Sequence, residues 1–196
     1  MQTPHLRFRA ALDEFGRRLD AIPGDAWEQP TPCAAWTVRD LVDHVVDETC
    51  WARSVLVPTP ADDNDADDAG GPEDPVARWH DAASALSPAL GSSEVLDRTI
   101  DLPSRRVPAR ELLPELTVDH LVHAWDLASA TGGDTHLDRD LVTACATWFD
   151  EHEDEWREAG QIGPALAVPA DADDQRSLLA RFGRQEHAPD DPGGLS

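Results

Sequence analysis

Apolar residues recur at steps of three and four positions in five long stretches of this chain, a spacing that places side chains on one face of an α-helix. The stretches predict helices over residues 5–22, 38–57, 75–90, 109–131 and 138–159. One short segment, 95–102, has the partial alternation of a strand and predicts a small β-hairpin with the stretch near Val107. The expected fold is therefore all-α in the main, most simply a bundle of four or five helices.

Capping and helix-breaking residues set the ends of these helices. Thr37 is the predicted N-cap of the second helix, with Asp40 three residues later as the acidic partner of a capping box. Pro23-Gly24 stops the first helix, and Gly132-Gly133 ends the fourth. Because Pro114 cannot donate a helical hydrogen bond, the fourth helix is expected to start late or to kink there.

The same spacing predicts which side chains point inward. In the first helix these are Leu6, Ala10, Leu12, Phe15, Leu19 and Ile22. In the second they are Leu41, Val45, Val46, Thr49 and Ala52. Each set forms an apolar stripe that a neighbouring helix can cover.

The chain is expected to hold one domain and a short appendage. Residues 1–160 form the predicted bundle, and residues 161–196 a C-terminal extension with a small apolar piece at 178–184. The acidic stretch 58–74 is predicted to be a solvated loop rather than a calcium site, because it lacks the EF-hand glycine and closing glutamate. The last dozen residues are expected to be disordered.

The charge of the chain excludes several functions. It has 16 basic and 39 acidic residues, which give a net charge of −23. A field of that sign repels phosphate backbones and anionic membrane surfaces, so no nucleic acid and no membrane partner is expected. No apolar run approaches the roughly 20 residues of a membrane helix, and the first residues lack the apolar core of a secretion signal. These features predict a cytoplasmic protein.

Lysine and cysteine usage narrows the chemistry further. The chain has no lysine, which excludes Schiff-base catalysis and phosphate binding by a P-loop lysine. Cys33, Cys50 and Cys145 are widely spaced, so neither a disulfide framework nor a cysteine zinc site is expected. At least two of the three thiols are expected to be buried. Cys33 remains an alternative nucleophile, although no histidine is its neighbour in sequence.

Two histidines lie among core residues where they could meet an acid. His44 follows Leu41 by three positions near the apolar side of the second helix, and His123 lies among apolar residues of the fourth. Asp119 precedes His123 by about one helical turn, so the two side chains share a face and can bind one divalent ion, with His44 as a third ligand. Such an ion would lower the pKa of a water or thiol in its open position.

A purely structural interpretation of these residues is also open. Asp119 and His123 could form an ion pair, and His44 could be a hydrogen-bonded core histidine. The side chains that compete as metal ligands are His80, His120 and Glu48. The histidines expected to face solvent are His5, His136, His152 and His187.

Three segments, in chain order, resemble a known family. The first contains Pro30-Thr31-Pro32-Cys33, then Trp36-Thr37-Val38-Arg39-Asp40-Leu41 and His44. The second is Asp119 followed by His123-Ala124-Trp125-Asp126-Leu127-Ala128 and Ala130-Thr131-Gly132. The third is Phe182-Gly183-Arg184. Together they resemble the mycothiol-dependent maleylpyruvate isomerase metal-binding domain family of the DinB/YfiT-like superfamily.

The resemblance implies a DinB-like four-helix bundle with up-down-down-up connectivity and a divalent metal, zinc or nickel, near one end. By position it implies that His44, Asp119 and His123 are the ligands, the trio that the spacing also suggests. The isomerase carries Glu in place of Asp119 and has a sizeable C-terminal domain, so maleylpyruvate is not assumed to be the substrate. Related bundles often dimerise, which leaves a homodimer as one assembly to expect.

The expected function is that of a metal-dependent thiol S-transferase or isomerase acting on a small electrophilic substrate. Mycothiol is the thiol that the resemblance implies. The alternatives are a non-catalytic metal- or ligand-binding bundle and a metal-dependent hydrolase. Trp36 and Trp125 are expected to wall the pocket. The arginines that could orient a carboxylate substrate are Arg39, Arg105, Arg106 and Arg110.

Overall fold

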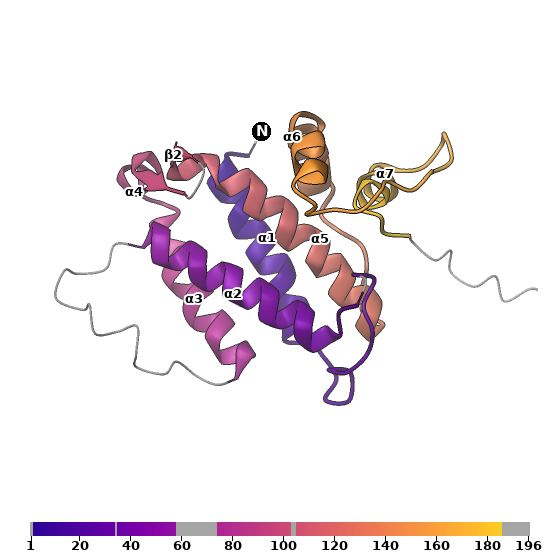
Figure 1. Ribbon diagram of the computed structural model, residues 1–196. Coiled ribbons are helices and arrows are strands. Elements are labelled where there is room, and N and C mark those ends of the chain that lie inside the picture. Colours follow the sequence, from indigo (N-terminus) through magenta and orange to yellow (C-terminus); the bar gives the residue numbers. More distant parts are fainter. Residues whose placement is uncertain (1, 34, 58–73, 103–104, 186–196) are drawn as a thin grey trace, which may run out of the picture. The chain divides into compact units, whose positions relative to one another are not determined.

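The computed structural model describes residues 2–33, 35–57, 74–102 and 105–185 (Figure 1). The chain divides into two compact units, residues 1–137 and residues 138–196. The expected division near residue 160 remains a prediction. The acidic stretch and the chain end, for which a flexible loop and disorder were predicted, lie almost entirely outside the described residues.

The described part of the chain is mainly helical, as predicted. The first unit contains α1 (Pro4–Leu19), α2 (Val38–Leu56), α3 (Pro75–Ala89), α4 (Ser93–Asp97), β1 (Thr99–Asp101), β2 (Arg106–Pro108), the 3-10 helix η2 (Ala109–Glu111) and α5 (Leu113–Thr131). The second unit contains α6 (Arg139–Glu158) and α7 (Asp174–Arg181).

Four long helices of the first unit form a bundle made of two pairs. α1 packs most extensively on α5, and α2 packs most extensively on α3. Thinner seams, between α2 and α5 and between α1 and α3, join the two pairs. Figure 1 shows α1 and α5 running in one direction and α2 and α3 in the other. This arrangement is the four-helix bundle with up-down-down-up connectivity that the family resemblance implies.

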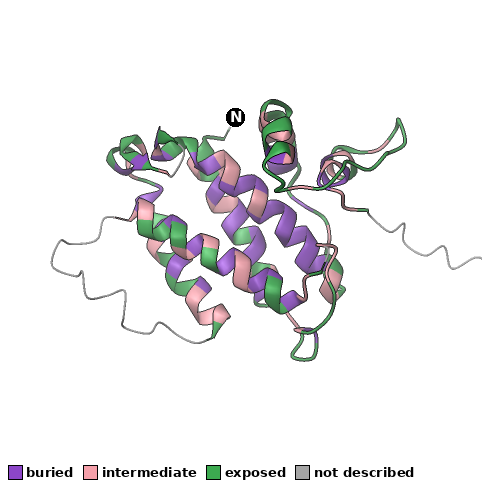
Figure 2. Cartoon of the chain, in the orientation of Figure 1, coloured by how far each residue is buried: buried purple, intermediate pink, exposed green. Residues whose placement is uncertain are grey.

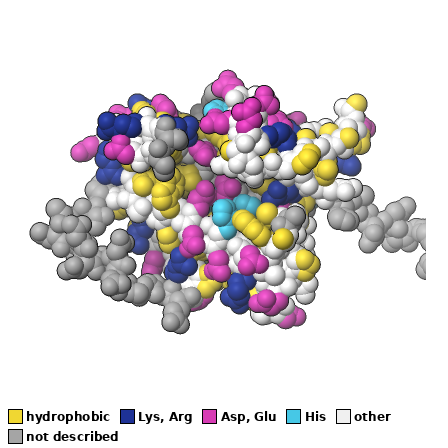
Figure 3. All heavy atoms as spheres, viewed as in Figure 1, with side chains coloured by type: hydrophobic (Ala, Val, Ile, Leu, Met, Phe, Trp, Pro, Cys, Tyr) yellow, Lys and Arg dark blue, Asp and Glu magenta, His cyan; other side chains and the backbone are white. Residues whose placement is uncertain are grey.

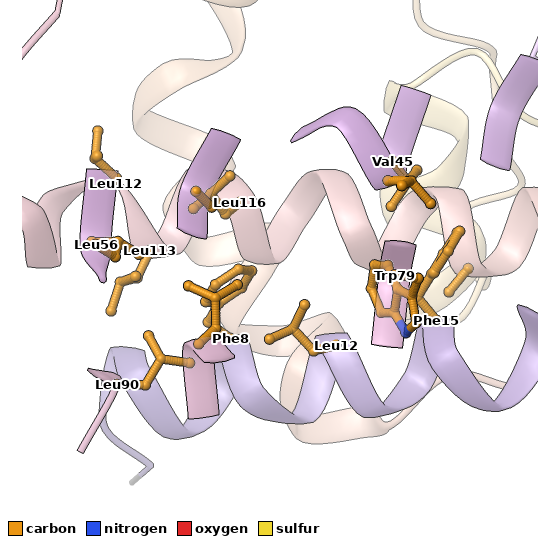
Figure 4. Close-up of a cluster of buried hydrophobic side chains, with 14 of the residues drawn as sticks. Phe8, Leu12, Phe15, Val45, Leu56, Trp79, Leu90, Leu112, Leu113 and Leu116 are labelled. Atoms are coloured by element: carbon orange, nitrogen blue, oxygen red, sulfur yellow. The ribbon is translucent and has the colours of Figure 1, made fainter. Parts of the chain in front are cut away.

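The core of the bundle consists of apolar side chains from all four helices. Phe8, Leu12 and Phe15 come from α1, and Figure 4 shows them among side chains of the other helices, with Phe15 beside Trp79. The ring centroids of Phe15 and Trp79 lie 4.8 Å apart. α5 is buried along most of its length, as Figure 2 shows, whereas α2 keeps an exposed face.

The sequence signals of α2 are confirmed in detail. The Thr37 backbone N–H donates to Asp40 Oδ2 at 2.8 Å, and the Asp40 backbone N–H donates to Thr37 Oγ1 at 3.2 Å, so the predicted capping box is present. The Thr37 hydroxyl also donates to Asp40 Oδ2 at 2.6 Å, and this bond, followed by the one from the Thr37 backbone N–H, holds the pKa of Asp40 below its ordinary value. All five residues predicted for the inner face of this helix are buried.

The face predicted for α1 is partly wrong. Leu6 is 44% exposed, whereas Phe8, which the prediction omitted, is fully buried. Phe8 lies four residues before Leu12, so it belongs to the stripe that continues through Phe15 and Leu19. Leu6 is two residues earlier, about 200° around the helix, and therefore on the opposite side.

The predicted hairpin is present but shorter than expected. β1 and β2 are antiparallel, with Thr99 opposite Pro108 and Ile100 opposite Val107. The start of the segment predicted as a strand forms α4 instead, because Ser92 caps a short helix there by accepting from the Val95 backbone N–H.

The fourth predicted helix starts late, as its proline required. Residues 109–111 form the separate turn η2, and α5 begins at Leu113 with Pro114 in its first turn, where a backbone N–H has no helical acceptor. α5 ends at Gly132, which adopts the left-handed conformation with φ of 69°.

Aromatic packing and ion pairs hold the helices of the second unit together. Phe149 stacks on Phe182 with ring centroids 4.3 Å apart, and both contact Trp156. Arg181 pairs with Glu153 at 2.7 Å, which ties α7 to α6. Residues 178–181 of the predicted apolar piece lie in α7, which packs on α6, and Phe182 follows as the C-cap of that helix.

Two further expectations can be compared with the structure. Only Cys145 is buried, while Cys33 and Cys50 are half-buried, so the prediction of two buried thiols was wrong. Among the described residues, no helix has both the length and the apolar character needed to cross a membrane.

Candidate metal centre

Two facing helices bring together the three side chains that the sequence singled out. His44 projects from the second turn of α2, and Asp119 and His123 project from successive turns of α5. One nitrogen of each histidine and one oxygen of Asp119 all lie within 4.8 Å of one another. The thin seam between α2 and α5 therefore carries a candidate metal-binding group.

The carboxylate of Asp119 lies between the two imidazoles. Its Oδ2 is 3.7 Å from His44 Nε2, and its Oδ1 is 3.6 Å from His123 Nε2. These distances exceed the roughly 2.7–3.2 Å of a hydrogen bond. Ligand atoms held about 2.0–2.2 Å from a tetrahedral zinc ion lie about 3.3–3.6 Å apart. The spacing therefore suits ligands that share an ion better than side chains that bond to each other.

A carboxylate on the side of the ring away from Asp119 fixes the orientation of His123. Its Nδ1 lies 3.1 Å from Oδ2 of Asp126, whose side chain is completely buried. A carboxylate that accepts from one ring nitrogen leaves the other nitrogen unprotonated and turned toward a metal. Asp126 therefore directs Nε2 of His123 toward Asp119. The sequence analysis gave no role to Asp126, although its position three residues after His123 was a signal for this contact.

Two buried carboxylate oxygens beside the group accept no hydrogen bond within the described residues. They are Oδ2 of Asp119 and Oε2 of Glu48, which lies one turn after His44 on α2. Burying such an oxygen without a donor is costly. A cation among His44, Asp119 and His123 would satisfy the Asp119 oxygen, so the residues present fit a divalent ion.

The two carboxyl groups have opposite pKa shifts. Burial, followed by the negative charge of Asp119, raises the pKa of Glu48 well above its ordinary value. Burial also opposes ionisation of Asp119. The positive charge of His123, followed by the polar side chains of His44 and Glu48, stabilises the carboxylate more strongly and holds the pKa of Asp119 below its ordinary value. Asp119 is thus the ionised member of the pair, as a metal ligand must be.

His120 is a supporting residue rather than part of this group. It lies within ligand distance of Glu48 and Asp119. However, its Nδ1 is 2.8 Å from the Leu116 carbonyl oxygen and its Nε2 is 2.9 Å from Thr49 Oγ1. Complete burial lowers the pKa of His120 to about 4. Both ring nitrogens are engaged inside the bundle, which fixes His120 behind the metal-binding group.

A loop that precedes α2 places Trp36 against both imidazoles. The ring centroid of Trp36 is 4.8 Å from that of His44 and 5.7 Å from that of His123. The Trp36 carbonyl oxygen accepts from the backbone N–H of Thr31 at 2.9 Å, and the Trp36 backbone N–H donates to the Cys33 carbonyl oxygen at 3.1 Å. These bonds hold the loop that carries Trp36, and the predicted role of Trp36 as a wall of a pocket remains a prediction.

The turn that carries Trp36 is strained. Ala35 has φ of 70°, in the left-handed region, and it is the only such residue other than glycine among the described residues. A side chain with a Cβ costs roughly 1–2 kcal/mol in that conformation. Strain of this kind is often stored where a neighbouring side chain must be held in place.

The group is open to solvent on one side. The side chain of His44 is 39% exposed and that of Asp119 is 19% exposed, whereas that of His123 is 8% exposed. Figure 3 shows histidine side chains at the surface in the middle of the view, bordered by acidic and apolar side chains. An ion held by three side chains here would keep a position for water or another ligand.

The structure does not bring all predicted side chains to this group. His80 pairs with Asp20 instead, with Nε2 and Oδ1 2.8 Å apart. Trp125 is buried, and its role as a wall remains a prediction. The four candidate arginines each pair with an acid: Arg39 with Glu28, Arg105 with Glu115, Arg106 with Asp101 and Arg110 with Asp97. Of the histidines expected to face solvent, His136 is exposed, whereas His5 and His152 are half-buried.

Comparison with known proteins agrees with this geometry. Residues 8–128 match the model of the mycothiol maleylpyruvate isomerase N-terminal domain. The chain belongs to this family. The match includes α2 and most of α5, and so all three residues of the candidate group. The third resembling segment, 182–184, lies beyond it.

Two proteins of Mycobacterium tuberculosis are similar in sequence to this chain. They are the uncharacterized protein MT0763 of strain CDC 1551 / Oshkosh and the uncharacterized protein Rv0738 of strain ATCC 25618 / H37Rv. Each is 34% identical over 143 residues, which cover 71% of this chain and 73% of the relative. No solved structure gives a significant match.

Proposed function

We propose that this chain binds one divalent ion, zinc or nickel, through His44, Asp119 and His123, and that it activates a low-molecular-weight thiol there. The observation that carries the proposal is the position of Asp119. Its carboxylate has an imidazole Nε2 on either side at 3.6 and 3.7 Å, and its Oδ2 is buried without a hydrogen bond within the described residues.

The three ligands would have different roles at a bound ion. Asp119 supplies the negative charge, His123 is held rigidly by Asp126, and His44 lies at the open side. When bound, a divalent ion lowers the pKa of a thiol or water at its open position. Trp36 would close one side of that position and exclude water from it.

The thiol reaction is supported by family membership. Mycothiol, the thiol in the name of the matched domain, is the proposed co-substrate. Its thiolate sulfur would add to the activated double bond of a small electrophile. Elimination after rotation about the resulting single bond would regenerate the thiol and leave the isomerised alkene. If the adduct takes up a proton instead, the product is the thioether and the reaction is an S-transfer.

The first experiment is to measure metal content by mass spectrometry on the purified protein. We expect about one divalent ion per chain, lost in both His44→Ala and His123→Ala. His136→Ala is the matched control, because His136 is exposed and pairs with an aspartate outside the group. Absence of metal in the wild type, even after dialysis against zinc and nickel, would overturn the proposal.

Thiol dependence then separates thiol chemistry from its alternatives. Metal-loaded protein is incubated with an activated cis-alkene, with and without mycothiol. Isomerisation or thioether formation that needs both metal and thiol supports the proposal. Hydrolysis of an ester probe without thiol would favour a metal-dependent hydrolase, and metal binding without turnover would favour a binding bundle.

A further inference from the structure

A hollow lies between α1 and α3, on the seam of the bundle opposite the candidate metal group. Its volume is about 410 Å³, within the range of small-molecule sites. Residues four apart line it on both helices, with Arg9, Asp13 and Arg17 on α1 and Ala83 and Ser87 on α3. The candidate metal group lies on the α2–α5 seam, so this groove is a separate feature of the first unit.

Small residues keep the groove open. Ala83 and Ser87 present little volume from α3, and Gly16 presents none from α1. A Cβ at Gly16 would lie 3.1 Å from Nε1 of Trp79, which is closer than side chains normally approach. Figure 4 shows the nitrogen of Trp79 on the side of α1. The edge of the Trp79 indole therefore lines the groove next to Gly16, and a larger residue at position 16 would have to displace it.

An arginine at one end of the groove has unused hydrogen-bonding capacity. Arg9 Nη2 reaches across the seam and donates to the Ser87 carbonyl oxygen at 2.9 Å. Its Nε is buried and makes no hydrogen bond within the described residues. A buried donor atom without an acceptor is costly, and a carboxylate is the acceptor whose geometry a guanidinium matches best.

The other charges of the groove argue against a simple anion. Asp13 lies one turn along α1 from Arg9, is exposed and forms no ion pair within the described residues. Arg17 is occupied by Glu14 at 2.8 Å, and Asp20 is occupied by His80 at 2.8 Å. The two charges that remain are the positive Arg9 and the negative Asp13. A chain with a net charge of −23 would also repel a plain anion.

We propose that the α1–α3 groove binds a small zwitterion of the α-amino acid class. Arg9 would hold the carboxylate, and Asp13 would hold the ammonium group. Leu12 and Ala83 supply apolar surface in the same groove for a short aliphatic side chain. The proposal is independent of the metal group and of its chemistry.

The test uses the indole N–H of Trp79 as a probe in nitrogen–proton correlation spectra. The chain has seven tryptophans, and Trp79→Phe identifies the signal of Trp79 by its loss. Three matched ligands are titrated at constant ionic strength: leucine, 4-methylpentanoate, which lacks the amine, and 3-methylbutylamine, which lacks the carboxylate. We expect a saturable shift with leucine and binding of the other two that is weaker by about tenfold or more.

Variants locate the binding. Arg9→Gln should abolish saturable leucine binding, and Asp13→Asn should reduce leucine affinity to that of 4-methylpentanoate. Gly16→Ala should weaken binding by displacing Trp79, while Arg7→Gln, on the same helix but outside the groove lining, should leave it unchanged. The backbone signals of each variant report whether the fold is kept. No saturable shift in the wild type, or the same leucine affinity in folded Arg9→Gln, would overturn the proposal.

Discussion

The buried carboxylate of Asp126 lies 3.1 Å from Nδ1 of His123 and thereby decides which nitrogen of that ring faces Asp119. Asp126 touches none of the open surface of the group. Its influence on a bound ion would therefore pass through His123 alone. Such carboxylates behind a metal-binding histidine both orient the ring and raise its basicity.

Replacement of Asp126 by Asn should weaken zinc binding about 10- to 100-fold, because the ring loses its charged acceptor. Competition with a chelating dye measures the affinity. Asp134→Asn is the matched control, since Asp134 holds Nδ1 of the exposed His136 at 2.9 Å in the same manner. Equal zinc affinity in the Asp126 variant and the control would contradict the role of Asp126 in orienting His123 toward a bound ion.

Trp36 should report the arrival of an ion at the group. Co²⁺ or Ni²⁺ quenches the fluorescence of a nearby indole, and the ring of Trp36 lies only 4.8 Å from that of His44. We expect metal-dependent quenching in the wild type that is largely lost in Trp36→Phe. Trp51→Phe should retain the quenching, because Trp51 lies two turns of α2 away from His44 and is 40% exposed. Quenching that survives in Trp36→Phe would place the ion elsewhere.

The strained turn beneath Trp36 should be relieved by Ala35→Gly. Glycine adopts a φ of 70° without a steric penalty, so the free energy of unfolding should rise by about 1 kcal/mol. Urea denaturation followed by circular dichroism measures it. The same substitution at Ala10, inside α1, should lower the stability by about 1 kcal/mol. A loss of stability in both variants would contradict the strain at Ala35.

His120 should make the metal-free protein less stable in acid. Burial lowers its pKa to about 4 in the folded chain, against about 6.5 in the unfolded chain. As the pH falls from 6.5 to 4, the unfolded chain gains a proton that the folded chain cannot accept. The free energy of unfolding should therefore decrease through this window, by at most about 1.4 kcal/mol per pH unit.

The raised pKa of Glu48 acts in the opposite sense. The stability that it contributes is fully present below the pKa of the unfolded side chain, and it is lost as the pH rises from there through the raised pKa of the folded one. The contribution of His120 is thus isolated by comparison with His120→Leu. Urea denaturation between pH 4 and 7 in the presence of a chelator should show a flatter acid side for the variant. Parallel curves would mean that His120 is not held neutral.

The helices were predictable where local chemistry and packing agree. The Thr37–Asp40 capping box fixes the start of α2, and its inner face follows from a period of 3.6 residues. In α1 the prediction mixed two faces, because Leu6 and Ala10 are apolar without being core residues. Apolar character alone does not tell a buried stripe from scattered surface residues.

The candidate group was predictable in part for a similar reason. Asp119 and His123 share a face by helical geometry, and the resemblance added His44 from a distant segment. Glu48 was named only as a competing ligand, and its place beside Asp119 depends on how α2 meets α5. The strain at Ala35 leaves no trace in the sequence, since an alanine there carries no sign of a left-handed backbone.

The division of the bundle into two helix pairs gives an ion at the α2–α5 seam a mechanical consequence. His44 belongs to the α2–α3 pair, and Asp119 and His123 belong to the α1–α5 pair. A bound ion would be a cross-link between segments far apart in the chain, and it would restrict the unfolded ensemble much as a disulfide does. One edge of the bundle would then be pinned by the ion. The opposite edge would be joined by the Arg9–Ser87 hydrogen bond, by the pairing of His80 with Asp20 and by side-chain packing. The two helix pairs would then move relative to each other about the seam that holds the ion.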